Sequence, residues 1–215
     1  MNIFYVIYRY LTIKEMTPEA RKKVVPRTVM FGGKAAPAYT TAKNVIKLIN
    51  EVSYVVNNDN ETKSLLKVVF MPNYNVSNAE TIIPASEISE HISTAGTEAS
   101  GTSNMKFVMN GGLIIGTFDG ANVEITEEVG EENIFIFGAR VEEINDLKHK
   151  MATTDPQEYL PPQMKKVFNA IHSGYFGDKA VLESLLHPLE NKHDTYLLGH
   201  DFPSYIEAQE RVGAE

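Results

Sequence analysis

The spacing of apolar residues predicts a helix at the start of the chain. Phe4, Ile7, Tyr8 and Leu11 recur at the helical period, so residues 2–15 are expected to form an amphipathic helix that packs on a core. No basic region precedes this apolar run, and no small-residue cleavage site follows it. A structural helix is therefore favoured over a targeting segment.

Short apolar runs farther along the chain predict the strands of a sheet. Two of them flank a helix that we expect to begin near Pro37 and to carry apolar residues from Ala42 toward Val56. A strand, a helix and a strand in this order indicate a right-handed parallel unit, and mostly apolar strands are typical of sheets covered on both faces. The predicted strands are residues 27–31, 65–70, 112–117 and 133–138.

Helical segments alternate with these strands. They are predicted at residues 78–83, 104–110 and 141–148, and a glycine-, serine- and threonine-rich loop occupies residues 93–103. The alternation predicts an α/β fold with a doubly wound parallel sheet.

Prolines interrupt this pattern after residue 150, and the remainder is predicted to be helical. The expected helices lie near residues 164–171, 181–186 and 205–212. We therefore expect residues 1–150 to form a Rossmann-like region and residues 151–215 to form a helical C-terminal extension of the same domain.

Composition narrows the classes of partner. The chain has 20 Lys and Arg residues against 28 Asp and Glu residues, a formal charge of −8 that opposes binding to nucleic acid or to an anionic membrane. We expect neither partner. The absence of cysteine excludes disulfides and thiolate metal sites. The histidines have no metal-ligand spacing, so no metal site is expected and all six are interpreted as structural or solvated: His91, His149, His172, His187, His193 and His200.

The loop before residue 104 carries the candidate chemistry. Gly96 and Gly101, with neighbouring serine and threonine residues, open a predicted helix whose amino end offers N–H groups and a positive dipole end to an anion. The dipole disfavours an ammonium charge on Lys106, and a neutral amine can form an imine with an aldehyde cofactor. The alternative is a simple connecting loop with a solvated Lys106. The residues alone leave both interpretations open.

A long segment resembles a known family. Residues 98–124, EASGTSNMKFVMNGGLIIGTFDGANVE, are similar nearly residue for residue to the pyridoxal-phosphate signature of α-1,4-glucan (glycogen or starch) phosphorylases. RTVMFGGKAAPAY at residues 27–39 and GEENIFIFG at residues 130–138 resemble the same family. A match of this length is far more specific than a short motif.

The resemblance implies a cofactor site. Lys106 would carry pyridoxal 5′-phosphate (PLP) as a Schiff base, and Thr102 and Ser103 would bind the 5′-phosphate of the cofactor. Tyr74 and Val76 match positions that lie near the cofactor in the family.

The resemblance also implies a reaction. Glu98, Ser100 and Gly101 would hydrogen-bond the glucosyl unit that is transferred, and with Lys106 and Thr102 they form the expected catalytic group. In the family, the cofactor phosphate acts as acid and base while inorganic phosphate attacks the glucosyl unit with retention, giving glucose 1-phosphate. Expected partners are therefore an α-1,4-glucan, inorganic phosphate and a second copy in a homodimer, and the expected location is the cytoplasm.

Two residues depart from the family pattern. Ser103 stands where the family usually has glycine, and Asn75 stands where it usually has arginine. The serine adds bulk near the phosphate, and the asparagine lacks a positive charge, so both place cofactor affinity in doubt. We interpret Lys34 as part of a strand-to-helix turn. Turn geometry and local hydrogen bonds, rather than direct catalysis, are expected for Asp119, Gly120, Asn122 and Glu124.

The resemblance covers only part of a phosphorylase. It implies most of the second, Rossmann-like domain of a two-domain glycosyltransferase-type fold, with the amino-terminal domain absent. Half of a closed cleft lacks much of the transition-state stabilisation, so these residues are expected to be inactive alone. The alternative is a non-catalytic truncated paralogue that keeps the fold and binds PLP or a partner subunit. An unrelated PLP enzyme, such as a transaminase, fits less well because the glucan-contact residues around Glu98 accompany the lysine.

Overall fold

The computed structural model describes residues 1–214, which divide into two compact units. Unit 1 comprises Met1–Tyr74 and Pro162–Asn191, and unit 2 comprises Asn75–Pro161 and the chain from Lys192 onward. The chain therefore passes from one unit to the other more than once. None of these limits falls near residue 150, and the division into domains expected there stays a prediction.

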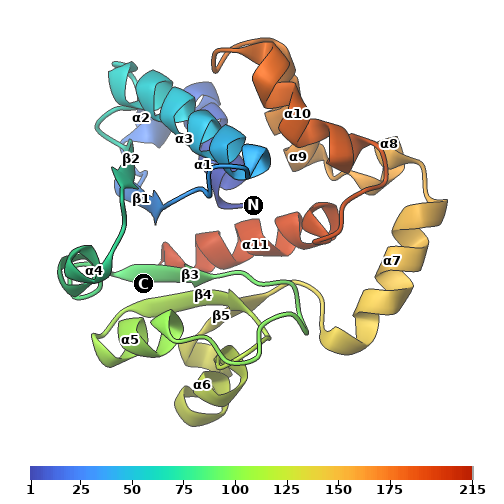
Figure 1. The fold of residues 1–215 in the computed structure, drawn as a ribbon. Coiled ribbons are helices and arrows are strands. Elements are labelled where there is room, and N and C mark those ends of the chain that lie inside the picture. Colours follow the sequence, from blue (N-terminus) through green and yellow to red (C-terminus); the bar gives the residue numbers. More distant parts are fainter. Residues whose placement is uncertain (215) are drawn as a thin grey trace. The chain divides into compact units, whose positions relative to one another are not determined.

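Unit 1 combines a two-stranded sheet with helices. Strands β1 (Arg27–Gly33) and β2 (Leu66–Pro72) pair in parallel, with Val29 opposite Val68. The helices are α1 (Asn2–Glu15), α2 (Pro18–Arg21), α3 (Thr40–Asn58), α9 (Pro162–His172) and α10 (Lys179–Glu190). The parallel unit expected from the sequence is thus present as β1, α3 and β2 (Figure 1).

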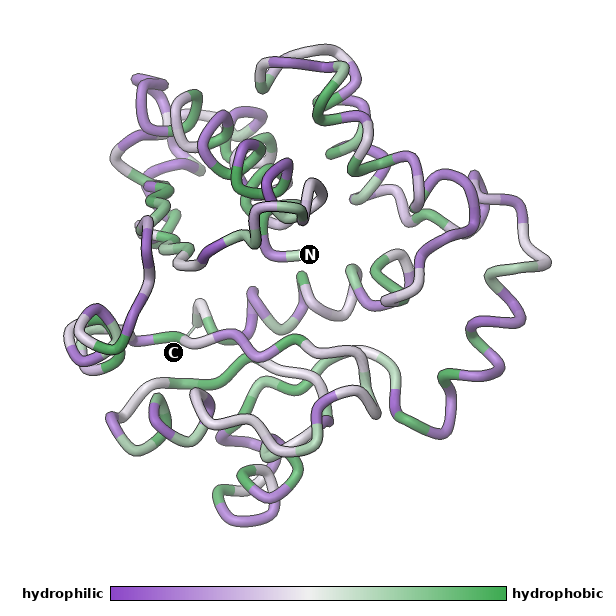
Figure 2. The backbone as a smooth tube through the Cα atoms, in the orientation of Figure 1, coloured by the Kyte–Doolittle hydropathy of each residue, from purple (hydrophilic) through white to green (hydrophobic). Residues whose placement is uncertain are grey.

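The apolar faces of the helices form the core of unit 1. Helix α1 has the expected extent, and its Phe4 ring meets Phe168 of α9 edge to face at 5.5 Å between centroids. Helix α3 alternates between apolar and polar residues along its length (Figure 2). Its buried residues are Leu48, Ile49, Val52 and Val56. The helix begins at Thr40, and Pro37 lies in the turn before it. Val45 faces outward.

The sheet of unit 1 is covered less completely than the sequence suggested. Val68 is fully buried, but Met30 on β1 is 46% exposed, so the expectation of strands covered on both faces is wrong within this unit. Helix α3 also closes the outer edge of β2. The Asn57 amide donates to the Val68 carbonyl at 2.8 Å and accepts from the Val68 N–H at 2.9 Å. These bonds take the place of a further strand at this point.

Unit 2 contains a three-stranded parallel sheet in the order β3–β4–β5. The strands are β3 (Ile88–His91), β4 (Leu113–Thr117) and β5 (Phe135–Phe137). Ile114 and Ile115 point to opposite faces of β4 and both are buried, so this strand is covered on both sides. Helix α5 (Ser103–Met109) packs on β3 and β4, and α11 (Leu198–Val212) packs on β4 and β5 (Figure 1).

The remaining elements of unit 2 connect these strands and helices. They are α4 (Val76–Ile82), α6 (Asn122–Val129), α7 (Ile144–Thr153), α8 (Pro156–Tyr159) and the 3-10 turns η1 (Glu131–Asn133) and η2 (Val141–Glu143). The sequence did not predict β3, α2, α6 or α8, and it placed the start of α11 seven residues too late, at residue 205 instead of 198. Within residues 1–214, no helix is long and apolar enough to cross a bilayer.

The α/β class with parallel strands is confirmed. The strands, however, form two separate hydrogen-bonded ladders of two and three strands. What the sequence predicted as one continuous sheet is thus observed as two smaller sheets, one in each unit.

Candidate functional site

A buried carboxylate holds the loop that carries the candidate residues. The Asp119 side chain, which is 6% exposed, accepts hydrogen bonds from the Ser93 hydroxyl at 2.7 Å, the Gly96 N–H at 2.8 Å and the Glu98 N–H at 3.0 Å. Burial alone would raise the pKa of Asp119, but these hydrogen bonds outweigh it and hold the pKa below its usual value. An ionised Asp119 therefore fixes the main chain around Glu98.

A glycine allows the loop to pack closely on the turn after β4. The Ala121 N–H donates to the Ser100 carbonyl at 2.5 Å. Gly120 has a φ of 51°, and a Cβ atom at this position would lie 2.5 Å from the Ser100 carbonyl oxygen. Any larger residue would push the loop away from the turn.

Two buried asparagines connect α5 to α6. Asn104 donates to the Asn122 side-chain oxygen at 3.0 Å, and the Asn122 amide donates to the Thr117 carbonyl at 2.9 Å. Asp119 and Asn122 make the local hydrogen bonds that were expected, and Gly120 has the expected turn geometry. The expectation of a turn is wrong for Asn122 and Glu124, because both lie in α6. Glu124 is exposed in the first turn of α6.

Most polar groups of the loop face outward, and of its exposed side chains the Ser100 hydroxyl donates to the Gly101 carbonyl at 3.3 Å. Glu98, Ser100, Thr102 and Ser103 are exposed, and Gly101 adopts a φ of 87° just before α5. In the part of the chain that the structure describes, the main-chain N–H groups of Gly101, Thr102 and Ser103 donate to no acceptor. These donors are available to an external anion or hydroxyl group.

Lys106 lies on the outer side of a well-anchored helix. Asn104 is 4% exposed, and the Phe107 ring packs edge to face on His91 at 5.9 Å between centroids. Burial lowers the pKa of His91 to about 4, so this ring is neutral at pH 7. The sequence did not single out Asn104 and Phe107, although their i, i+3 spacing marks one helix face. Lys106 lies off that face, and its amine is exposed and pairs with no carboxylate of residues 1–214.

The other residues expected near the cofactor lie outside this loop. Tyr74 ends unit 1, where it packs on Gly32; a Cβ atom at Gly32 would lie 3.0 Å from the Tyr74 ring. Val76 opens α4 and is 76% exposed. Asn75 is the N-cap of α4, and its side-chain oxygen accepts from the Asn78 N–H at 3.1 Å. Sequence reasoning missed this capping role, which an asparagine just ahead of a predicted helix could have indicated.

The candidate site therefore consists of one continuous segment. The structure brings together Glu98, Ser100, Gly101, Thr102, Ser103 and Lys106 on the loop and the first turns of α5. It gives Tyr74 and Val76 separate surroundings, so their proximity to the cofactor stays a prediction. Lys34 is exposed in the turn after β1, as expected.

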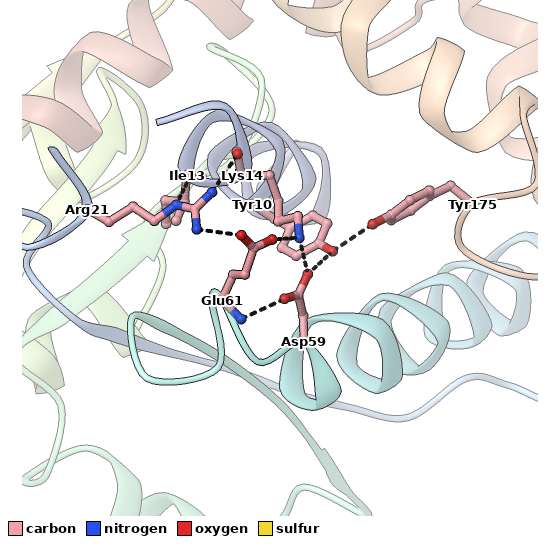
Figure 3. Close-up of polar contacts among 7 residues, drawn as sticks. All are labelled: Tyr10, Ile13, Lys14, Arg21, Asp59, Glu61 and Tyr175. Atoms are coloured by element: carbon pink, nitrogen blue, oxygen red, sulfur yellow. Dashed lines mark hydrogen bonds and ion pairs between the residues drawn. The ribbon is translucent and has the colours of Figure 1, made fainter. Parts of the chain in front are cut away.

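A second dense cluster of polar groups, in unit 1, serves the fold (Figure 3). Lys14 pairs with Glu61 and, at 3.0 Å, with Asp59, while Arg21 pairs with Glu61 at 2.8 Å. The buried Tyr10 hydroxyl donates to Asp59 at 2.7 Å. Burial and the hydrogen bonds with Tyr175 and Asp59 raise the pKa of Tyr10, so it stays protonated. Each charged group in this cluster has a partner within the protein, which leaves little capacity for a ligand.

No group of three or more His, Asp or Glu side chains that could hold a metal ion occurs among residues 1–214. The histidine with the most polar contacts, His172, bridges Glu183 at 2.9 Å and Glu190 at 2.7 Å. These two hydrogen bonds, with Glu190 contributing more than Glu183, raise the pKa of His172 above its usual value. The bridge joins α9 to α10 and is structural.

Comparison with known proteins identifies the family. The family model described as carbohydrate phosphorylase matches residues 1–215. The chain is 54% identical over 217 residues to alpha-glucan phosphorylase 2, cytosolic, of Arabidopsis thaliana, covering 99% of this chain and 25% of that protein. It is 55% identical over 212 residues to glycogen phosphorylase 2 of Dictyostelium discoideum, covering 99% of this chain and 21% of that protein.

A fungal relative gives a similar match. Over 223 residues the chain is 52% identical to glycogen phosphorylase of Saccharomyces cerevisiae, covering 100% of this chain and 24% of that protein. The chain thus spans between 21% and 25% of the length of these three relatives. Because the family model matches the chain over its whole length, the chain belongs to the carbohydrate phosphorylase family.

Proposed function

We propose that this chain is the cofactor-carrying part of an α-1,4-glucan phosphorylase, which transfers a terminal glucosyl unit from a glucan to inorganic phosphate. The bond between the glucosyl C1 and the oxygen of the next glucose breaks, a C1–phosphate bond forms with retention, and the departing oxygen gains a proton. The names of the relatives from three organisms, all glycogen or alpha-glucan phosphorylases, support this reaction. A homodimer and a cytosolic location, the latter printed in the name of the Arabidopsis relative, belong to the same proposal.

The residues of the loop fit PLP. The cofactor needs an amine for its aldehyde and donors for its 5′-phosphate. Lys106 offers an amine that pairs with no carboxylate in the described part of the chain, and Thr102 and Ser103 offer N–H groups that lack protein acceptors. When bound, PLP supplies a phosphate that acts as acid and base toward the substrate phosphate. Tyr74 and Val76 are proposed to line the cofactor.

The chain's own residues position the sugar. Glu98 and Ser100 extend exposed side chains from a main chain that Asp119 holds in place, and Gly101 adds an N–H group. Carboxylate, hydroxyl and amide groups in fixed positions are suited to the hydroxyl groups of a glucosyl unit. Because the loop is anchored on its buried side, little order must be gained when the sugar binds.

The proposal rests on one observation: the main chain of the Glu98–Lys106 segment is anchored, while the side chains of Glu98 and Lys106 have no protein partner among residues 1–214. Absorbance of the imine band during titration with PLP tests the lysine assignment. The Lys106→Ala variant should lose the band, whereas Lys148→Ala should keep it, because Lys148 is an exposed lysine on a helix of the same unit. An unchanged band in Lys106→Ala would refute the assignment.

The Rossmann-like, doubly wound description belongs to this proposal and concerns the complete domain of a phosphorylase. The parallel order β3–β4–β5, with α5 and α11 packed on the sheet, supports it. The proposal also includes the expected inactivity of these residues alone. Mixing the purified chain with glucan, phosphate and PLP should release no glucose 1-phosphate, and sustained release would contradict the expectation.

A non-catalytic PLP-binding protein is the second candidate. Asn75 favours it, because the position where the family usually has arginine here caps α4 through its side chain. Joining the chain to the remaining domain of a relative would separate the two candidates. Glucose 1-phosphate release by such a chimaera would support the phosphorylase, and PLP binding without release would support the non-catalytic protein.

A further inference from the structure

A groove of about 450 Å³ lies in unit 2 beside the candidate site. One wall comes from the residues after β4, including Phe118 and Gly120, and the other comes from η2 and the residue before it, including Arg140 and Glu142. Both walls thus follow the carboxyl ends of adjacent parallel strands. In parallel α/β sheets, ligands commonly bind outside these strand ends.

The groove is lined by charged side chains that form no ion pair within residues 1–214. The Arg140 guanidinium lies 3.9 Å above the centre of the Phe118 ring. Stacking uses the flat face of the guanidinium and leaves the N–H groups on its edge available for bidentate hydrogen bonds. Within residues 1–214, the Arg140 side chain pairs with no carboxylate, and the carboxylates of Glu131 and Glu142 pair with no cation.

The charges of the lining favour a neutral ligand. Asp119, Glu131 and Glu142 contribute negative charge to the groove, against one positive charge from Arg140. This balance opposes a phosphate group or another anion. A polyhydroxylated ligand matches the groove better, because each sugar hydroxyl group can donate to a carboxylate and accept from the guanidinium. Val123 and Val141 provide apolar walls for the carbon face of a sugar ring.

The groove shares a wall with the loop that is proposed to hold the transferred glucosyl unit. The position of a Cβ atom on Gly120 lies 2.9 Å from the Glu98 Cγ atom, and that of a Cβ atom on Gly96 lies 3.6 Å from the Val141 methyl groups. Asp119 lines the groove and also holds the Gly96 and Glu98 N–H groups. A ligand in the groove would therefore touch the opposite side of the segment that carries Glu98.

We propose that the Arg140–Phe118 groove is a second carbohydrate-binding site, which takes a glucosyl unit of a neutral α-glucan. The choice of an α-glucan rests on the proposed function, whereas the binding of a neutral sugar rests on the groove itself. The lining of this groove does not include Lys106, and the site needs no cofactor.

Titration of the isotope-labelled 215-residue chain with maltotriose, followed by NMR of the amide groups, tests this site. We expect shifts at residues 118–123 and 140–142. Arg140→Ala should weaken maltotriose binding at least about tenfold, because it removes charge-assisted hydrogen bonds. The matched control is Arg211→Ala. Arg211 lies on α11, and its guanidinium lies 5.6 Å above the Phe135 ring of β5. This change should leave the maltotriose affinity unchanged.

Two further experiments test this site independently of the proposed function. Lys106→Ala should keep the maltotriose shifts in the groove, even if PLP binding is lost or was never present. Inorganic phosphate, used as an anionic probe, should leave the groove amides unshifted. The proposal is overturned if maltotriose leaves these amides unshifted, if Arg140→Ala binds it as tightly as Arg211→Ala, or if phosphate shifts them instead.

Discussion

The polar cluster around Asp59 in unit 1 and the Glu98–Lys106 segment in unit 2 use the same kinds of residue in opposite ways. In the first, Lys14, Arg21 and Glu61 form ion pairs with one another or with Asp59, and Tyr10 is buried among them (Figure 3). In the second, Lys106 and Glu98 extend into solvent without a protein partner among the described residues.

The difference shows where hydrogen-bonding capacity is used for folding and where it is left for a ligand. Satisfied charges fix the end of α1 against the turn before β2, because Lys14 pairs with Asp59 and Glu61. The Arg21 guanidinium caps the same helix end by donating to the carbonyls of Ile13 and Lys14. Around the loop, only the buried groups are used in this way. A lysine or glutamate is therefore a better candidate for ligand binding when the neighbouring main chain is anchored and its own side chain has no protein partner.

The largest expected effect comes from breaking the unit 1 cluster. Asp59→Ala removes the acceptor of the Tyr10 hydroxyl and of Lys14, and it should lower the free energy of unfolding by about 2 kcal/mol. Chemical denaturation measures this loss. Glu98→Ala is the matched control, and it should leave the denaturation midpoint unchanged because its exposed carboxylate has no partner to lose. Equal losses in the two variants would remove the contrast.

A second change tests whether anchoring supports binding. Asp119→Asn keeps the shape of the side chain but replaces an acceptor oxygen with a donor, so it should lose the bonds from Ser93, Gly96 or Glu98. We expect a loss of about 2 kcal/mol in the free energy of unfolding, together with weaker PLP binding. Lys106→Ala should lose PLP binding without the loss of stability. A stable Asp119→Asn protein with unchanged PLP affinity would contradict the anchoring role.

The histidines His91 of unit 2 and His172 of unit 1 should make opposite contributions to the pH dependence of stability. Burial lowers the pKa of His91 to about 4 from its usual 6.5, so the unfolded chain binds a proton in that window more readily than the folded chain does. The stability of unit 2 should therefore be full above pH 6.5 and fall by about 2 kcal/mol toward pH 4. The pKa of His172 is raised, so its contribution to unit 1 is present below pH 6.5 and is lost as the pH rises through the raised value.

Hydrogen exchange separates these two contributions. Protection of the β4 amides reports on unit 2, and protection of the α9 amides reports on unit 1. His91→Gln should flatten the acid-side loss for β4, and His172→Gln should flatten the loss on the alkaline side for α9. The assignment of His91 is wrong if the acid-side loss for β4 is the same in His91→Gln as in the parent chain.

The smallest effect is expected at Asn75. Asn75→Ala should cost about 1 kcal/mol because α4 loses its cap, whereas Asn75→Ser should keep most of the stability. Asn75→Arg loses the cap as well, but it restores the positive charge that the family usually has at this position. PLP should bind more tightly to Asn75→Arg than to Asn75→Ala. Identical PLP affinities in an absorbance titration would show that residue 75 lies away from the cofactor phosphate.

The sequence predicted those parts of the fold in which apolar residues are periodic. Helices α1, α3 and α9 each bury an apolar face, and their positions were expected. Strand β3 was missed because it contains Ser89, Glu90 and His91, which are polar side chains held by hydrogen bonds or burial. Helix α6 was missed for a related reason, because its buried residues are Asn122 and Thr126. Periodicity cannot reveal a core that is built from satisfied polar groups.

The candidate residues are adjacent in the sequence, whereas the contacts that hold them come from distant parts of the chain. A continuous segment from Glu98 to Lys106 can be recognised in one window of sequence, and so can the turn that begins at Asp119. The hydrogen bonds between these two segments depend on the pairing of β3 with β4. The stacking of Arg140 on Phe118 joins residues that follow different strands, so no local pattern could have indicated the groove.

The most direct test of the account is to locate the covalent adduct. The chain would be incubated with PLP, reduced with borohydride and digested, and the modified peptides would be identified by mass spectrometry. We predict that the pyridoxyl group is found on Lys106 and that little is found on other exposed lysines such as Lys148. Labelling spread over many exposed lysines, with no preference for Lys106, would contradict it.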